Sequence, residues 1–375
     1  QGRYAPGSTF KPCTAIAALE SGVTTTSEKI RDTGLWYYPD MIAGTEPFTA
    51  WCWNHAGHGL QNVTQAITNS CNYYFYTMGY RLGIDRLDEY AAAFGLGSRT
   101  GIEIGDDPGV LAGPAYSESI GQTWYGGNTV MAAIGQSDNL FTPIQLANYI
   151  ATLAGGGDHY AAHLLKSVKS YDNSSVLYAD APAPLNTVSI QPENLAAVKN
   201  GMHDLTTKGS LAGYFSRCVV DAGAKTGTAQ ISKLTKNNGV FVCFAPFDEP
   251  EIALAIVIEK GGSGAALANA AVDILNAYFT KDEIGYTVVG EDELIPRSSA
   301  LPRSRLAGPG SAFPSFPHTF SPERTCFYER TLCFRSPLRA LQVALRRRVL
   351  RPRGDVSRPP AGAGGLYPLR AGAAV

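Results

Sequence analysis

The spacing of apolar residues changes near residue 222, and this change restricts the fold more than any other feature of the sequence. Up to Leu205 the apolar positions recur mainly at helical intervals of three and four residues. Three short apolar segments then follow, separated by turn-like residues: Ala222–Ile231, Val240–Ala245 and Ile252–Ile258. We therefore expect an α+β fold, in which an antiparallel sheet lies beside helices.

Helices are predicted before and after these strands. The first begins at Pro6–Ser8 and ends at Gly22, where glycine terminates the apolar pattern. Residues 23–60 are rich in aromatic side chains and are expected to be irregular. The other predicted helices are Val63–Thr77, with an interruption at Asn69–Asn72, followed by Leu87–Phe94, Ile144–Ala154, Pro192–Leu205 and Leu267–Phe279.

Composition and charge both change at about Pro296. Residues 1–296 carry 17 Lys and Arg against 29 Asp and Glu, so this part offers no footprint for nucleic acid. Residues 297–375 carry 14 Arg, no Lys and 3 acidic residues, with abundant proline and glycine. We predict a disordered tail over 282–375. Two alternatives are a membrane- or RNA-binding helix at Arg346–Arg348, within the apolar stretch Leu338–Leu350, and an out-of-frame or chimeric extension.

Membrane spans, disulfides and metals are not expected. The sequence contains no run of 18 apolar residues, so no transmembrane helix is predicted. The seven cysteines are odd in number and irregularly spaced, unlike a disulfide framework. Cys52, His55 and His58 have a spacing that suits zinc, but no fourth ligand is evident in the sequence. We therefore predict no metal and no organic cofactor.

Ser8-Thr9-Phe10-Lys11 places a hydroxyl and an amine three residues apart at the start of the first predicted helix. Residues at this spacing share one helix face. Lys11 can therefore serve as the base that the weakly nucleophilic Ser8 needs, provided that burial lowers its pKa. The helix N-terminus also favours a developing oxyanion. The pattern is weak by itself, because an ordinary N-cap serine explains it equally well.

Ser70-Cys71-Asn72 lies at the break in a helical stretch. A hydroxyl at Ser70 can relay a proton to a leaving amine, and the Asn72 amide can bind a substrate carbonyl. The competing explanation is a simple Ser/Asn turn. Ser137-Asp138-Asn139 has a similar composition and is the alternative candidate for the same role.

Lys225-Thr226-Gly227-Thr228 falls inside the first predicted strand. Lys225 supplies positive charge, and the hydroxyls of Thr226 and Thr228 suit a carboxylate. Gly227 in a strand interior indicates close approach by a ligand. The amide of Thr228 can complete an oxyanion hole with that of Ser8. In this order, the three motifs are those of penicillin-binding proteins and serine β-lactamases.

Longer stretches support this interpretation over about residues 3–280. On these the chain resembles a class B penicillin-binding protein, the monofunctional transpeptidase type, and most closely the elongation-type penicillin-binding protein 2 sequences of Gram-positive bacteria. The stretches are Tyr4–Pro12, Gly57–Gly59, Asn69–Tyr76, Phe94–Gly97, Ile134–Gln136, Asn139–Asn148, Ala224–Gln230 and Ile258–Gly264.

The resemblance implies a penicillin-binding protein or serine β-lactamase-like fold with an all-helical subdomain, over residues 1–281. It implies that Ser8 is acylated by a D-Ala-D-Ala stem peptide, with Lys11 as its base, and that the acyl group then passes to an amine of a neighbouring stem peptide, which cross-links peptidoglycan. Implied site roles are proton transfer and cleft shape for Ser70 and Asn72, and carboxylate binding for Lys225, Thr226 and Thr228.

The same resemblance implies partners and a location. The expected partners are peptidoglycan stem peptides, β-lactam antibiotics and, for the parent protein, the elongation or division machinery. The expected location is the extracytoplasmic face of the bacterial cell membrane.

One departure from the family lies at the front of the chain. Only seven residues precede Ser8, whereas family members carry a membrane anchor, a pedestal domain and the first sheet strands there. We therefore expect a truncated piece of a longer polypeptide. The strand Ile252–Ile258 would then be left as an apolar edge, and the chain would be poorly stable or prone to aggregate.

Two other functions stay open from the sequence. A serine β-lactamase is favoured by Ser8–Lys11 and by Tyr125–Asn128, but no Glu-x-x-Leu-Asn segment supplies its deacylating base. A penicillin-binding fragment or sensor without turnover is the other alternative.

Overall fold

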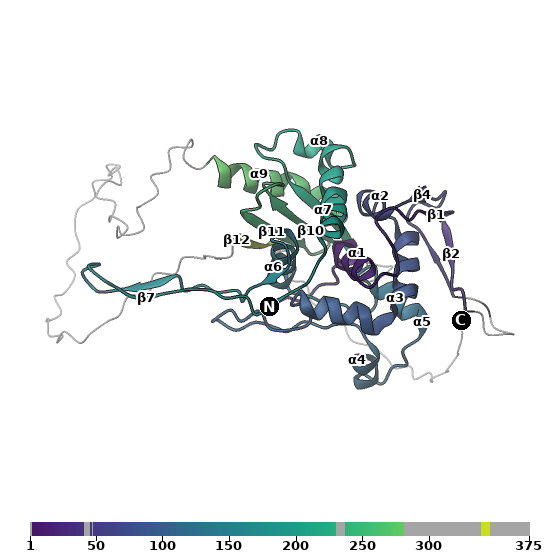
Figure 1. Cartoon of the computed structure of the whole chain (residues 1–375), viewed down its shortest axis with the longest axis horizontal. Coiled ribbons are helices and arrows are strands. Elements are labelled where there is room, and N and C mark those ends of the chain that lie inside the picture. The colour runs from purple at the N-terminus through teal and green to yellow at the C-terminus, as the bar shows by residue number, and fades with distance from the viewer. Residues whose placement is uncertain (1, 41–45, 47, 230–236, 281–338, 346–375) are drawn as a thin grey trace, which may run out of the picture.

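A computed structural model describes residues 2–40, 46, 48–229, 237–280 and the strand 339–345. In this part of the chain, a four-stranded sheet lies between helices (Figure 1). Its strand order is β12-β11-β10-β9, with antiparallel pairing among the last three. The strands are β9 (Gly223–Ala229), β10 (Asn238–Ala245), β11 (Ile252–Ile258) and β12 (Arg339–Leu345).

Strands β10 and β11 are buried on both faces, which explains their continuous apolar runs. Side chains alternate across a strand, so Val240 and Val242 of β10 join one core, while Phe241 and Cys243 join another. The first core includes α1 (Lys11–Glu20) and α6 (Pro143–Ala154), and the second includes α8 (Ala212–Phe215) and α9 (Ala268–Phe279). The predicted α+β fold is confirmed.

The helical part surrounds α1, whose residues from Lys11 to Leu19 are all buried. It packs against α3 and α7, and a short 3-10 turn, η1, precedes it. No helix in the described ranges is both long and apolar enough to cross a membrane. The remaining helical elements are η1 (Gly7–Phe10), α2 (Val63–Thr68), α3 (Asn72–Ala93), α4 (Pro114–Ser119), α5 (Gly126–Ala132), α7 (Pro192–Thr207) and η2 (Gly264–Leu267).

The expectation that residues 23–60 are irregular is wrong. Two small antiparallel sheets form there, β1 with β4 and β2 with β3. Each strand has three residues, which is too short for alternation to show in the sequence.

Two further pairs, β5 with β8 and β6 with β7, lie between α6 and α7, and the β6–β7 hairpin projects from the body (Figure 1). The bounds are β1 (Ile30–Asp32), β2 (Leu35–Tyr37), β3 (Thr49–Trp51), β4 (Gly59–Gln61), β5 (Asp158–His159), β6 (Ser167–Lys169), β7 (Val176–Ala179) and β8 (Asn186–Thr187).

The apolar edge predicted at β11 is covered. β12 pairs with β11 in parallel along its whole length, from Ile252 opposite Arg339 to Ile258 opposite Leu345. The prediction of an open edge is therefore wrong, and so is the expectation of disorder for these seven tail residues. An apolar segment of the right length satisfies the free N–H and C=O groups of the edge strand. The rest of the predicted tail, and the Arg346–Arg348 alternative, lie outside the described residues.

Candidate active site

Ser8 stands in the η1 turn, against strand β9. Gly7 makes this approach possible, because its φ of +53° lies in the left-handed region, and a Cβ there would sit 3.1 Å from the Thr228 carbonyl oxygen. The Gly7 amide also donates to the Gly135 carbonyl at 2.9 Å. Ser8 is therefore fixed beside the backbone of Thr228, as an oxyanion hole built from these two residues requires.

Lys11 lies one turn further on and is completely buried. Its Nζ donates to the Ser70 carbonyl at 2.8 Å and to the Asn72 side-chain oxygen at 2.6 Å, and it lies 3.2 Å from Ser70 Oγ. The ring of Phe75 lies 5.5 Å from this nitrogen. The first and second motifs are thus joined by direct hydrogen bonds.

Ser70-Cys71-Asn72 forms the break between α2 and α3. Ser70 has φ of +50°, a conformation that costs free energy in a residue other than glycine and that gathers at functional sites. Cys71 caps α3, with its Sγ accepting from the Tyr74 amide at 3.3 Å. The predicted interruption at Asn69–Asn72 is confirmed, and its consequence is that Ser70 and Asn72 both reach Lys11.

Lys225 reaches the same serine from β9. Its Nζ lies 3.0 Å from Ser70 Oγ and 3.2 Å from the Thr226 carbonyl oxygen, and its side chain is completely buried. Thr226 is half-buried and Thr228 is exposed, so their hydroxyls are accessible to a substrate. Lys11, Ser70 and Lys225, which lie far apart in the sequence, therefore form one cluster.

Gly227 has a different neighbour from the one predicted. A Cβ at this position would lie 2.4 Å from the Pro6 carbonyl oxygen and 3.1 Å from the Thr9 side chain. The close approach that a strand glycine indicates is thus made by the chain's own η1 turn, and the expectation of a ligand at Gly227 itself is not supported. The residue positions the Ser8 turn against the strand.

Burial sets the protonation of the two lysines. It lowers the pKa of Lys11 to about 8, against the opposing charges of Cys71 and Cys52. Burial, aided by the charge of Lys11, lowers the pKa of Lys225 well below its usual value. Two ammonium groups around one hydroxyl repel each other, so the neutral amine that a general base requires is accessible near neutral pH.

The alternative tripeptide at Ser137–Asn139 serves the loop in which it lies. The buried Asn139 side chain accepts from the Ala112 amide at 3.0 Å and donates to the Ala132 carbonyl at 3.2 Å. Its amide therefore holds backbone segments together. These bonds favour Ser70-Cys71-Asn72 as the second motif.

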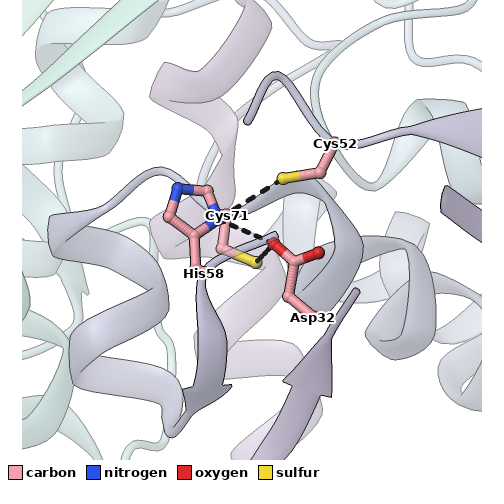
Figure 2. A group of neighbouring side chains, drawn as sticks. All are labelled: Asp32, Cys52, His58 and Cys71. Carbon is pink, nitrogen blue, oxygen red and sulfur yellow. Dashed lines mark hydrogen bonds and ion pairs between the residues drawn. The ribbon is translucent and has the colours of Figure 1, made fainter. Parts of the chain in front are cut away.

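A second cluster contains Cys71 of this motif, and it includes Cys52 and His58 of the suspected zinc triplet together with two residues that the sequence did not indicate as ligands. Asp32, Cys52, His58 and Cys71 bring their donor atoms within 4.8 Å of one another (Figure 2). His58 Nδ1 lies 2.7 Å from Asp32 Oδ2 and 3.5 Å from Cys52 Sγ, and Cys71 Sγ donates to Asp32 Oδ2 at 3.2 Å. His55, the third residue of the suspected zinc triplet, instead stacks on the Trp51 ring.

This donor set fits a zinc-type ion. Two thiols, an imidazole and a carboxylate are all ligand types that tetrahedral zinc takes. The hydrogen bond between the two thiols lowers the pKa of Cys52 to about 6 and raises the pKa of Cys71, so in this arrangement Cys52 is the thiol that forms a thiolate more readily. Asp32 Oδ1 accepts from the Gly34 amide at 2.7 Å, and this bond fixes the carboxylate. The structure thus brings Cys52 and His58 together with two candidate ligands, Asp32 and Cys71, that were not evident as such in the sequence.

The comparison with known families agrees with this geometry. The model of the family described as "Penicillin binding protein transpeptidase domain" matches residues 1–277. The chain belongs to this family. Among curated relatives of the transpeptidase family, the peptidoglycan D,D-transpeptidase MrdA of Escherichia coli is 31% identical over 294 residues. The matched part covers 74% of this chain and 45% of MrdA, so the chain spans less than half the length of that relative.

Solved structures of penicillin-binding protein 2 (PBP2) share the transpeptidase fold. PBP2 of Pseudomonas aeruginosa in complex with WCK 5153 superposes with a TM-score of 0.66 at 32% identity, covering 76% of this chain and 63% of that one. PBP2 of Helicobacter pylori, in its complex with MreC, superposes with a TM-score of 0.62 at 26% sequence identity. The match covers 76% of this chain and 50% of that one. The expected resemblance to PBP2 is confirmed; these matches give no particular support to the Gram-positive placement.

Proposed function

We propose that this chain is the catalytic part of a penicillin-binding serine D,D-transpeptidase that cross-links peptidoglycan. The observation that carries the proposal is the convergence of Lys11 and Lys225 on the Ser70 hydroxyl, beside the turn that holds Ser8. The catalytic unit extends over residues 1–281, since the family match ends at 277 and the last helix of the body ends at Phe279.

In the acylation step, Ser8 Oγ attacks the carbonyl carbon of the penultimate D-alanine. Neutral Lys11 takes the hydroxyl proton as the bond to carbon forms. The amides of Ser8 and Thr228 receive the oxyanion. The C–N bond to the last D-alanine then breaks, and Ser70, in contact with both lysines, passes a proton to the leaving amine. The product is an ester on Ser8 and free D-alanine.

Binding of the donor is assigned to β9. Lys225 provides the positive charge near the cleft, and the hydroxyls of Thr226 and Thr228 take the terminal carboxylate. Asn72, oriented by its bond to Lys11, is placed to bind a substrate carbonyl. A β-lactam carries a carboxylate and a strained amide at comparable positions, so we expect it to acylate Ser8 in the same way.

The partners and location follow from the family. A relative of known structure, PBP2 of Helicobacter pylori, was solved as a complex with MreC. We propose that the parent protein meets a comparable elongation or division partner and acts at the extracytoplasmic face of the bacterial cell membrane, where stem peptides are found.

Labelled penicillin followed by an unlabelled chase tests the activity. A long-lived adduct on Ser8, located by mass spectrometry, is the expected result. Rapid release of the label would show a β-lactamase instead, because that enzyme hydrolyses its acyl ester quickly. A wild-type chain that folds but takes no label would be a fragment without turnover.

A further inference from the structure

An exposed tryptophan, Trp53, borders the active site, and a second, Trp51, precedes it by two residues. No step described above uses either side chain. From Thr49 to Trp53 exposure alternates, with Ala50 and Cys52 buried and the residues between them exposed. Trp51 is 51% exposed and Trp53 is 62% exposed. Trp51 ends β3 and Trp53 follows it in a bend, and the Trp51 ring also lies 4.7 Å from the ring of His55.

Trp53 is hydrogen-bonded directly to the backbone of the second motif. Its Nε1 donates to the carbonyl oxygens of Asn69 and Ser70, both at 3.1 Å. Its ring also meets His58 edge-on, with centroids 5.1 Å apart. A large aromatic side chain that is held rigidly while more than half exposed binds a ligand at little entropic cost. Trp53 is therefore placed to contact a ligand that binds beside Ser70.

Transpeptidation brings two peptides to Ser8, and two segments flank the cluster of Lys11, Ser70 and Lys225. One is β9, which lies at the end of the described strand order and is assigned above to the donor. The other contains Ser70 and Asn72, and Trp53 is bonded to its backbone. If the donor lies along β9, the second peptide reaches the Ser8 ester past Ser70 and Asn72, the segment to which Trp53 is bonded.

The chemistry of an indole face matches what the second peptide brings. Its nucleophile is a primary amine, which is an ammonium ion at neutral pH, and a cation is attracted to the face of a tryptophan ring. The excess of acidic residues over residues 1–296 favours a cation in the same way. We propose that Trp53, with Trp51 two residues before it, binds the amine-bearing side chain of the acceptor stem peptide. This inference rests on the proposed transpeptidase function.

The step that follows balances simply. The bound ammonium gives one proton to water, and the free amine attacks the ester carbon on Ser8. A C–N bond forms, the C–O bond to Ser8 breaks, and the second amine proton returns to Ser8 Oγ through Lys11. The tryptophans bind and orient the acceptor; they exchange no proton.

Two nucleophiles of different charge test the assignment on the whole chain. Acylated protein is offered Nα-acetyl-lysine, which is cationic, or hydroxylamine, which is neutral at pH 7, and the ratio of aminolysis to hydrolysis is measured. For Trp53→Ala and Trp51→Ala we expect the half-saturating concentration of Nα-acetyl-lysine to rise about two- to fivefold, with a smaller change for hydroxylamine. Trp53→Phe, which keeps a ring face, should recover part of the loss. Tyr171→Ala, on the 99%-exposed tip of the projecting hairpin, is the matched control.

Other results overturn the assignment. Equal losses with both nucleophiles would show that charge is not recognised. A loss confined to the rate of acylation by labelled penicillin would place the tryptophans on the donor side. Unchanged partitioning in Trp51→Ala and Trp53→Ala would remove them from substrate binding. If wild-type protein takes no label on Ser8, the transpeptidase proposal fails before the acceptor is tested.

Discussion

The Nζ of Lys225 lies 3.0 Å from the Ser70 hydroxyl oxygen, although 155 positions separate the two residues in the chain. Lys11 approaches the same oxygen at 3.2 Å. A proton can therefore move between two buried amines through one hydroxyl, without water. This relay connects Lys11, the proposed base for Ser8, with the strand assigned to the donor carboxylate.

The relay predicts that acylation by penicillin speeds up as pH rises and levels off above about pH 8. Burial lowers the pKa of Lys11 to about 8, so at neutral pH most molecules still carry its proton. The base is the neutral amine, so below this pKa its fraction grows about tenfold per pH unit. Stopped-flow rates across the neutral range measure the profile. Rates that fall with rising pH would contradict the assignment of Lys11 as base.

Alanine substitutions distinguish the proposed roles of Ser8, Ser70 and Ser137. Ser8→Ala should take no penicillin label at all, because the nucleophile is missing. Ser70→Ala should slow labelling by roughly 10²–10³-fold, the usual contribution of proton transfer. Ser137→Ala is the matched control, since it changes the similar tripeptide outside the lysine cluster. A normal rate in Ser70→Ala together with loss in Ser137→Ala would exchange the two assignments.

Much of the site was predictable because its signals are local. The Ser8–Lys11 spacing depends only on helix geometry, and the structure adds that Lys11 is buried, as a lysine base requires. The Asn69–Asn72 interruption and the Ile252–Ile258 strand were visible because turn residues and continuous apolar runs are strong patterns. The proposed function rests on three separate motifs that occur in the order found in the family.

What the sequence hid depends on contacts between distant segments. Asp32 joins Cys71 across 39 positions, and nothing around Asp32 marks it as a ligand. The spacing of Cys52 and His58 was a visible signal, but it gave no indication that Asp32 and Cys71 would join them. Gly227 was correctly noticed but given the wrong neighbour, because a strand glycine does not reveal whether a ligand or the chain approaches it.

Gly227→Ala should weaken both the fold and the reaction. The added Cβ would lie 2.4 Å from the Pro6 carbonyl, so the turn that carries Ser8 must move. We expect a loss of roughly 1–3 kcal/mol in the free energy of unfolding and slower labelling by penicillin. Gly213→Ala in α8 is the matched control, since its Cβ would meet nothing within 4 Å. Wild-type behaviour of both variants would refute the contact.

The second cluster predicts zinc in the purified protein. We expect about one equivalent per chain by elemental analysis, a lower melting temperature after treatment with a strong chelator, and recovery on adding zinc back. His58→Ala and Cys71→Ser should lose the metal. Cys218→Ser, a half-buried cysteine away from this cluster, should keep it. Metal-free wild type with an unchanged melting temperature would leave the four side chains as a hydrogen-bonded group only.

Pairing of β12 with β11 predicts that the segment Arg339–Leu345 keeps the chain monomeric. Unpaired, β11 would present a row of free backbone groups to other chains. Successive N–H groups of a strand point to opposite sides, so changing both Val343 and Ala344 to proline removes the one that faces β11, whichever it is. We expect this variant, and a chain ending at residue 338, to form higher oligomers by light scattering, whereas a chain ending at 345 stays monomeric. If all three chains remain monomeric with equal melting temperatures, the edge is protected by something other than β12.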